Sequence, residues 1–213
     1  MNRTSGVEEL VFVVQKHKAT SLHYDFRLEI GEVMPSWSIP KGPSLDSSVK
    51  RLALPTGDHL LEYRHFEGVI RGENGAGPVM IWDEGTYGPE VEVSKGVRKE
   101  IVDRGEAESV ARKSLQEGNL KFHLYGKKLR GSFALVRTKG FGGRESWLLI
   151  KHRDEYSQEG YDAGDYDFSS VSGRSLAEIA SQVESGGPSS TVTGSTGKLF
   201  GPSPMNGKER KRD

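Results

Sequence analysis

One stretch of sequence decides the fold of this chain: His17-Lys-Ala-Thr-Ser-Leu-His23-Tyr-Asp25-Phe-Arg27-Leu-Glu29-Ile30. From residue 22 onward, apolar and polar residues alternate without interruption. Successive side chains of a β-strand point to opposite faces, so one face of this segment is apolar and faces the core. The other face carries His23, Asp25, Arg27 and Glu29 in a row. The pattern therefore predicts a strand that presents an imidazole, two carboxylates and a guanidinium on one side.

An ordinary solvated strand would also explain alternating charges, and in that case these groups would have no special role. Two observations favour a functional site. His17 lies six residues upstream, just after the apolar run from Leu10 to Val14, where a first strand is expected to end. The chain has only six histidines, and two of them flank this strand. Two imidazoles and a carboxylate are a common ligand set for a divalent metal.

The rest of the chain predicts a mainly β fold. Short, mostly alternating segments are separated by Gly, Pro or Asp turns, which is typical of a compact antiparallel β-barrel. One or two short helices are expected beside it, at 106–117 and after the capping box Ser175–Glu178. The strands are expected at 10–16, 22–30, 33–39, 50–54, 68–71, 78–82, 90–93, 120–125, 131–137 and 146–152.

The length of 213 residues suits one domain, which we place at residues 10–185. A flexible arm is expected at 1–9 and a disordered tail at 186–213, because the tail is rich in Gly, Ser, Thr and Pro. The whole chain has 30 basic and 30 acidic side chains. The tail has five basic and two acidic residues, a net charge of +3. The rest of the chain therefore has a net charge of −3, and the neutrality of the whole chain argues for a local site over an extended nucleic-acid groove.

Composition also excludes several classes of protein. No run approaches 18 apolar residues, so no transmembrane helix is expected, and the N-terminus lacks the apolar core of a secretion signal. The chain has no cysteine, which excludes disulfides and thiolate ligands. Any metal must be held by histidines and carboxylates, which favours Mn²⁺, Fe²⁺ or Zn²⁺.

Further along the chain, four residues complete a candidate phosphate site. Lys41 lies in a Pro-Lys-Gly-Pro bend, and Arg51 opens an apolar strand. His59 and Tyr63 are four residues apart and share a face if that segment is helical or turned. By itself, Lys41 is better interpreted as an exposed turn residue. Around a metal, however, Arg, Lys and Tyr suit a phosphoryl group, whose charge must be stabilised as the leaving oxygen departs.

These motifs, in this order, resemble the 3′-phosphoesterase module of bacterial and archaeal DNA ligase D over roughly residues 11–155. The resemblance rests on Phe-Val-Val-Gln-Lys-His17, Leu-His23-Tyr-Asp25-Phe-Arg27-Leu-Glu, Trp37-Ser-Ile-Pro-Lys41-Gly-Pro, Lys50-Arg51-Leu-Ala, Asp58-His59, Phe66-Glu-Gly-Val-Ile, Gly75-Ala-Gly-Pro-Val-Met-Ile-Trp82, Leu129-Arg-Gly-Ser-Phe and Trp147-Leu-Leu-Ile-Lys-His. It implies a β-barrel enzyme that removes 3′-terminal ribonucleotides and 3′-phosphates in non-homologous end joining. The length leaves no room for polymerase or ligase modules, so a stand-alone form is expected.

The resemblance also implies roles for individual residues. The metal ligands would be His17, His23 and Asp25, with Mn²⁺ preferred and Co²⁺ or Zn²⁺ as alternatives. The catalytic, phosphate-contacting residues would be Arg27, His59 and Tyr63, and the anion pocket would be completed by Lys41 and Arg51. Two residues, Gln15 and Glu29, would orient the ligands. The implied partners are DNA or RNA–DNA primer-template 3′ ends, a separate ATP-dependent ligase, a polymerase or primase, and Ku. The protein would be a monomer in the cytoplasm of a prokaryote, associated with the nucleoid.

Two other functions remain open on the sequence. In a non-haem Fe(II) oxygenase, His23, Asp25 and His59 would form a two-histidine-one-carboxylate triad and His17 would be dispensable. A non-catalytic module that recognises DNA ends or serves as a scaffold would bind 3′-phosphate ends but would not convert them. The chain also departs from the family pattern, with Arg71-Gly-Glu-Asn74 where an aromatic residue is common, and with a longer, more charged segment at 93–119. These departures bear on substrate preference more than on metal binding.

Overall fold

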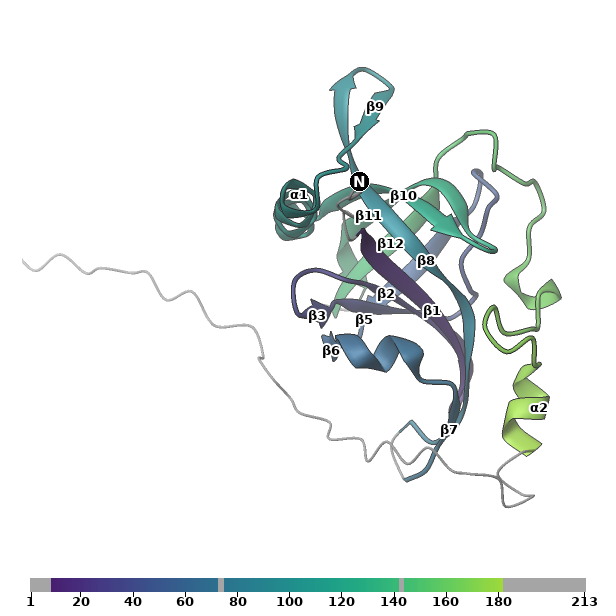
Figure 1. Cartoon of the computed structure of the whole chain (residues 1–213). Coiled ribbons are helices and arrows are strands. Elements are labelled where there is room, and N and C mark those ends of the chain that lie inside the picture. The colour runs from purple at the N-terminus through teal and green to yellow at the C-terminus, as the bar shows by residue number, and fades with distance from the viewer. Residues whose placement is uncertain (1–8, 73–74, 142–143, 182–213) are drawn as a thin grey trace, which may run out of the picture.

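A computed structural model describes residues 9–72, 75–141 and 144–181 of the chain. Its centre is a closed antiparallel β-barrel of eight strands (Figure 1). The strands follow one another around the barrel in the order β1 (Leu10–Lys18), β2 (Leu22–Leu28), β4 (Ser36–Ile39), β5 (Lys50–Pro55), β12 (Arg144–Lys151), β11 (Arg130–Phe141), β10 (Asn119–Gly126) and β8 (Gly77–Ser94). Pairing of β8 with β1 closes the ring.

Smaller elements lie around this barrel. Two short strands, β7 (Gly68–Ile70) and β9 (Val97–Glu100), pair with opposite ends of β8, and β3 (Val33–Met34) pairs with β6 (His59–Leu60). The β8–β9 hairpin projects from the barrel (Figure 1). Two 3-10 helices, η1 (Leu61–His65) and η2 (Ala163–Asp165), and two α-helices, α1 (Arg104–Glu117) and α2 (Leu176–Ser181), complete the fold. Helix α1 packs mainly on β10, and α2 packs on β8 and β7.

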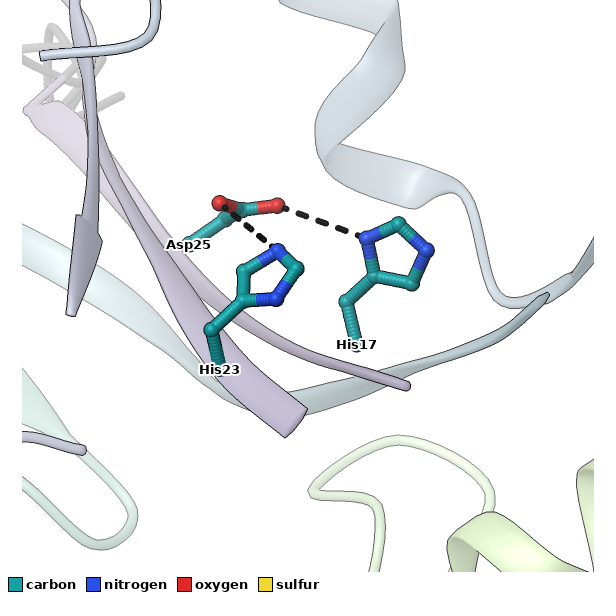
Figure 2. Close-up of side chains that lie close together, drawn as sticks. All are labelled: His17, His23 and Asp25. Atoms are coloured by element: carbon teal, nitrogen blue, oxygen red, sulfur yellow. Dashed lines mark ion pairs between the residues drawn. The ribbon is translucent and has the colours of Figure 1, made fainter. Parts of the chain in front are cut away.

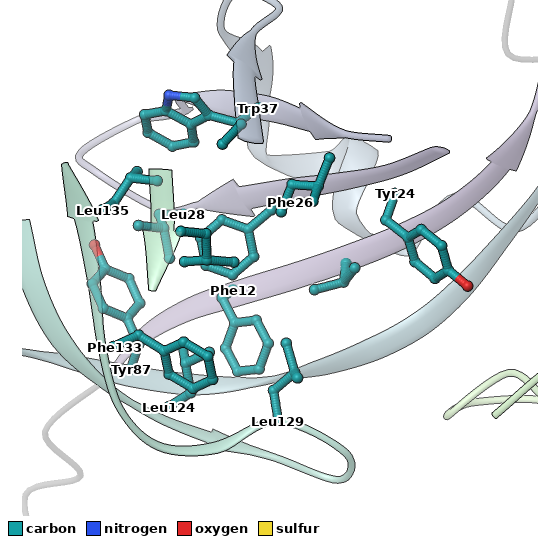
Figure 3. Packing of buried hydrophobic residues seen from close by; sticks show 14 of the residues in the cluster. Phe12, Tyr24, Phe26, Leu28, Trp37, Tyr87, Leu124, Leu129, Phe133 and Leu135 are labelled. Carbon is teal, nitrogen blue, oxygen red and sulfur yellow. The ribbon is translucent and has the colours of Figure 1, made fainter. Parts of the chain in front are cut away.

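The barrel interior is filled by the apolar residues of the alternating strands, as the sequence predicts. The predicted core face of β2 contributes Tyr24, Phe26 and Leu28, all buried, although Leu22 at the start of the strand is 39% exposed. Phe26 lies beside Phe12 in the cluster (Figure 3) and also stacks against Phe122. Fully burying such a side chain contributes about 1.5–3 kcal/mol, so the core face of β2 is strongly specified. The polar residues of β2 must therefore face outward.

Apart from small shifts at strand ends, the predicted division into strands differs from the structure in two places. The predicted strand 33–39 is divided into β3 and β4 at Pro35. Conversely, the predicted strands 78–82 and 90–93 belong to one long strand, β8. The glycines between them do not form a turn. A Cβ on Gly85 would lie 2.2 Å from the Tyr125 carbonyl oxygen, and one on Gly88 would collide with the Glu100 side chain, so these glycines permit close approach of neighbouring chain segments.

Both predicted helices are present, although α1 begins at Arg104, two residues before the predicted start. The side chain of Asp103 accepts a hydrogen bond from the Glu106 amide at the start of α1, and Gly118 ends this helix with φ of 82°. The capping box before α2 is formed, because Ser175 and Glu178 exchange hydrogen bonds. Among the residues described, no helix is both long and apolar enough to cross a membrane. The predicted N-terminal arm, except Glu9, and the predicted tail lie outside the described residues.

Candidate metal centre on the outer face of the barrel

The functional residues predicted from β1 and β2 lie next to each other because of the register of this hairpin. His17 is paired with His23, and Gln15 is paired with Asp25. Directly opposite residues of antiparallel strands point to the same face, so these four side chains lie together on the outside of the barrel. A β-bulge interrupts the β1–β8 pairing between Val14 and Gln15, beside this group. Bulges of this kind re-aim side chains and are common next to active sites.

Three of these side chains form a cluster that could hold a metal ion. The candidate ligand atoms of His17, His23 and Asp25 all lie within 4.8 Å of one another. His17 Nδ1 is 3.9 Å from Asp25 Oδ2, and His23 Nε2 is 3.6 Å from Asp25 Oδ1 (Figure 2). These separations are too long for direct hydrogen bonds. The three groups therefore face a shared point without satisfying one another.

The outer nitrogen of each imidazole is anchored to a backbone carbonyl. His17 Nε2 lies 2.9 Å from the Gly75 oxygen, and His23 Nδ1 lies 3.0 Å from the Ser21 oxygen. A carbonyl only accepts, so each of these nitrogens carries a proton, and in the neutral ring the nitrogen that faces Asp25 carries the lone pair. Metal-binding histidines are typically oriented in this way. The residues present thus fit a divalent ion held by two nitrogens and a carboxylate.

The ionisation of the three groups is set by burial and by their mutual charges. Burial, together with the nearby His23, lowers the pKa of His17, whereas interaction with the Asp25 carboxylate raises the pKa of His23. Burial tends to raise the pKa of Asp25, but interactions with His23 and Arg27 outweigh it, so that pKa is below its usual range. Asp25 is therefore a carboxylate at neutral pH, and its charge favours a bound cation.

Arg27 is the centre of the hydrogen-bond network behind the cluster. Its side chain is 3% exposed, and its Nη2 donates to Asp25 Oδ2 at 3.0 Å. Its Nε donates to Gln15 Oε1 at 2.8 Å, and Gln15 Nε2 in turn donates to the carbonyls of Tyr63 and Phe66. The guanidinium also lies over the Tyr63 ring, 5.1 Å from its centre. Gln15 was predicted to orient the metal ligands; its bonds reach Arg27, which in turn bonds to Asp25, and its role stays a prediction.

His59 joins the network through Arg27. Arg27 Nη1 lies 2.9 Å from His59 Nδ1, and because a guanidinium only donates, Nδ1 is the acceptor and the ring proton lies on Nε2. Burial and the charge of Arg27 lower the pKa of His59 to about 4, although the Gly57 carbonyl acts in the opposite direction. His59 is consequently a neutral imidazole at physiological pH, with its N–H on the nitrogen that does not face Arg27.

Helix η1 forms a wall over one side of this network. His59 and Tyr63, predicted to share a face, do so: their ring centres are 5.1 Å apart. Beneath the wall, Leu61 packs on a small apolar cluster outside the barrel, formed by Val13, Met34 and Ile81. Burial raises the pKa of Tyr63, so its phenol is protonated at neutral pH. The wall thus excludes water from Arg27 and holds Tyr63 next to it.

Three predicted site residues lie apart from this network. Arg51 is paired with Leu149, a buried residue of the core, so it is on the interior side of the sheet and not on the outer face. Its charge acts on Asp46. Lys41 is exposed in the loop after β4. Glu29 follows β2, and its carboxylate accepts hydrogen bonds from the Val11 amide and from Arg104, at the far end of the strand from His23.

Sequence reasoning did not identify Ser36 or the carbonyls of Gly75 and Ser21. Ser36 is paired with Arg27, and its Oγ lies 3.2 Å from His59 Nδ1. A signal for Ser36 was available, because Ser36 and Ser38 flank the buried Trp37 on the next strand. The carbonyls could not be found in this way, because any residue type supplies one.

A closed antiparallel barrel with oriented imidazoles and a carboxylate on its outer face, backed by a buried arginine, defines a β-barrel protein with a candidate metal site. Comparison with known sequences gives the family. Residues 15–137 match the family described as the DNA Ligase D 3′-phosphoesterase domain, and the chain belongs to this family. The matched region contains all the residues of the network described above.

Similar proteins include multifunctional non-homologous end joining proteins of the LigD type. The chain is 42% identical over 146 residues to the protein from Pseudomonas aeruginosa, which covers 68% of this chain and 15% of that protein. It is 38% identical over 149 residues to the DNA repair protein from Mycobacterium tuberculosis, a match that covers 70% of this chain and 17% of that protein. It is 37% identical over 145 residues to the protein from Mycolicibacterium smegmatis, a match that covers 68% of this chain and 17% of that protein. The chain thus spans 15–17% of the length of these relatives.

Proposed function

We propose that the protein is a divalent-metal-dependent phosphoesterase that processes DNA 3′ ends. It removes 3′-terminal ribonucleotides and 3′-phosphates and leaves a 3′-OH that a ligase can seal, as a 3′-phosphodiesterase (3′-ribonuclease) and 3′-phosphatase. The observation that carries this proposal is the orientation of His17 and His23, whose outer nitrogens are bonded to carbonyls so that the other nitrogen of each ring faces Asp25 and can bind a metal from the neutral ring. Family membership supports the same reaction class.

The residues of the network have complementary tasks in this proposal. The metal would be held by His17, His23 and Asp25, and a bound divalent ion polarises a phosphoryl oxygen and makes bound water more acidic. His59, neutral and protonated on Nε2, donates to a phosphate oxygen. Arg27 uses three of its five N–H groups within the protein, so two are left to neutralise charge on the phosphoryl group. The protonated phenol of Tyr63 is a further donor.

The proposed biological setting follows from the family. The substrates are DNA or RNA–DNA primer-template 3′ ends, and Mn²⁺ is the proposed cofactor, with Co²⁺ and Zn²⁺ as alternatives. A separate ATP-dependent ligase, a polymerase or primase, and Ku are proposed partners in non-homologous end joining. We propose that the protein acts as a monomer in the cytoplasm of a prokaryote. Lys41 remains a predicted phosphate contact, whereas Arg51, which the register places on the interior side of the sheet, is not proposed for this role.

The test uses a primer-template duplex whose primer ends in one ribonucleotide or in a 3′-phosphate. We expect conversion to a 3′-OH end with Mn²⁺, no conversion with EDTA, and none with His23→Ala. The matched control is His123→Ala, because His123 lies on β10, outside the network, and this variant is expected to remain active. Activity of His23→Ala equal to that of the wild type would contradict the proposed site.

The same experiment separates the two alternatives. A non-catalytic scaffold would bind the 3′-phosphate end without converting it, even with Mn²⁺. The oxygenase interpretation needs His59 as a metal ligand, but His59 Nδ1 faces Arg27, and among the described residues the metal-compatible cluster includes His17 instead. Full metal affinity of His17→Ala would nevertheless favour the oxygenase.

A further inference from the structure

An exposed apolar patch lies beside the metal centre on the same outer face of the barrel. Its members are Leu52 and Leu54 of β5, which are 45% and 37% exposed. The register connects this patch to the metal centre: Asp25 is paired with Ser38, and Ser38 is paired with Leu54. Because paired residues share a face and neighbouring strands are about 5 Å apart, Leu54 lies roughly 10 Å from the strand that carries Asp25.

The patch lies on the open side of the metal centre. On the other side, η1 covers β1 and β8 through Leu61 and the bonds from Gln15, which closes that approach to Arg27. On the β4–β5 side, Ser38 is half-buried and both leucines are exposed. A long substrate whose end lies at the metal centre would therefore extend over β4 and β5.

The chemistry of this side suits the uncharged part of a nucleotide. Ser38, the residue between Asp25 and Leu54 in the register, is small and uncharged. Leu52 is paired with the half-buried Leu148 of β12, so the apolar surface continues onto the next strand. Single exposed leucines are common on proteins. Here two lie on one face of a strand, next to Leu148 and beside the candidate site, and together they form an apolar surface that a ligand can bind. Leucine side chains pack against the faces of nucleobases.

We infer that the patch formed by Leu52 and Leu54 is a binding subsite for the terminal nucleoside of the strand whose 3′ end is processed. This inference rests on the proposed function and specifies how the same site holds its substrate. The metal centre and Arg27 bind the phosphate, and the leucines cover the base of the nucleotide that carries it. The subsite recognises an apolar base face and no particular base, because leucine has no hydrogen-bonding group.

The test compares two 3′-phosphorylated primer-templates that differ only at the primer's terminal nucleotide, which carries a base in one and is a tetrahydrofuran abasic analogue in the other. For the wild type we expect a KM about three- to tenfold higher on the abasic substrate. In the double variant Leu52→Thr/Leu54→Thr, the KM for the base-carrying substrate should rise to the value that the wild type has for the abasic substrate. The KM of this variant for the abasic substrate should equal that of the wild type. Threonine keeps the strand preference, and Leu54→Met, which keeps the apolar surface, should behave as wild type.

Val97→Thr is the matched control, because Val97 is an exposed apolar residue on the β8–β9 hairpin and its replacement should change neither KM. Wild-type KM values of the double variant on both substrates would overturn the subsite and leave the patch to a protein partner. Equal rises on both substrates would also overturn it, because the effect would not depend on the base. If the wild type converts neither substrate, the proposed function fails and this inference fails with it.

Discussion

The direction of hydrogen bonds at individual residues determines what each side chain of the site can do. Arg27 can only donate, so it fixes Asp25 and His59 as acceptors. The carbonyls of Gly75 and Ser21 can only accept, so they fix the tautomers of the two candidate metal-binding histidines. Each of these three imidazoles thus has its neutral tautomer fixed by its hydrogen-bond partner. The site is preorganised by partners that do not titrate near neutral pH.

Gln15 tests this preorganisation. Its replacement in Gln15→Leu removes the acceptor of Arg27 Nε and the donor to the carbonyls of Tyr63 and Phe66. We expect a loss of about 1–3 kcal/mol in the free energy of unfolding, because buried polar groups lose their partners. We also expect kcat to fall about tenfold or more, with Mn²⁺ affinity within about threefold of wild type, because Gln15 positions Arg27 and not the metal ligands. Calorimetric titration and urea unfolding check these expectations; unchanged kcat would contradict the positioning role.

His59 gives the protein a stability that depends on pH with a definite sign. Its pKa is about 4 in the folded protein, below its ordinary value of 6.5. As the pH falls from 6.5 towards 4, the unfolded chain binds the proton first, so stability is present above this window and is lost within it. The slope should stay below the single-proton limit of about 1.4 kcal/mol per pH unit, because the ring is partly exposed. Urea unfolding in EDTA at pH 7.5 and pH 5.0 should show a smaller pH dependence for His59→Gln than for wild type; equal dependence would refute the assignment.

At the scale of elements, the segment that follows η1, the wall over the site, is held by hydrogen bonds to both β1 and β8. The carbonyl of Phe66 accepts from Gln15 on β1, and the next residue, Glu67, accepts from the Ile81 amide on β8. Glu67 also accepts from Arg174 and Ser172, in the segment that leads to α2. Residues that lie beyond the part of the chain matched to the family therefore help to hold the segment that carries Tyr63.

Removing this fastening should loosen the wall without removing the metal ligands. In Glu67→Ala we expect faster hydrogen exchange at 61–67 and a kcat about tenfold lower, because small displacements of positioning groups slow the chemical step. Mn²⁺ affinity should not change. The control is Glu92→Ala, because Glu92 pairs with Lys121 on the surface, away from η1. Faster exchange at 61–67 with wild-type kcat would show that the wall does not position the site.

Much of the site could be predicted from the elements, because alternation in β2 is a local property. It separated Tyr24 and Phe26 from Asp25 and Arg27 correctly. Glu29 was included by the same alternation, but it lies four residues beyond Asp25, on the order of 13 Å along the chain, and bonds to a different part of the barrel. Ser36 depends on the register between β2 and β4, which alternation within one strand does not give.

Arg51 illustrates the same limit. Its position at the start of a strand was predicted correctly, but the face to which it points is determined by pairing with Leu149 across a long sequence separation. The β8 strand was divided in the prediction for a related reason. Gly85 and Gly88 are typical of a turn in isolation, whereas in the barrel they lie where neighbouring chain segments approach closely. Contacts between distant segments decide both cases.

For the whole molecule, the closed barrel has no free edge among its eight strands, and the three candidate metal ligands lie on the neighbouring strands β1 and β2. A ligand that binds only the folded state stabilises it, by about 2.7 kcal/mol at a concentration one hundred times Kd. We therefore expect Mn²⁺ to raise the Tm of the EDTA-treated protein by several degrees, with the rise increasing with metal concentration.

His17→Ala should have little or no such rise, because it loses one of the three ligands, and His123→Ala should behave as wild type because His123 lies on β10. The comparison does not depend on any nucleic-acid substrate, so it separates metal binding from catalysis. A metal-induced rise in His17→Ala equal to that of wild type would mean that His17 is not a ligand, and the neutral, oriented imidazole at this position would then need a different role. Differential scanning fluorimetry over a range of Mn²⁺ concentrations makes this measurement directly.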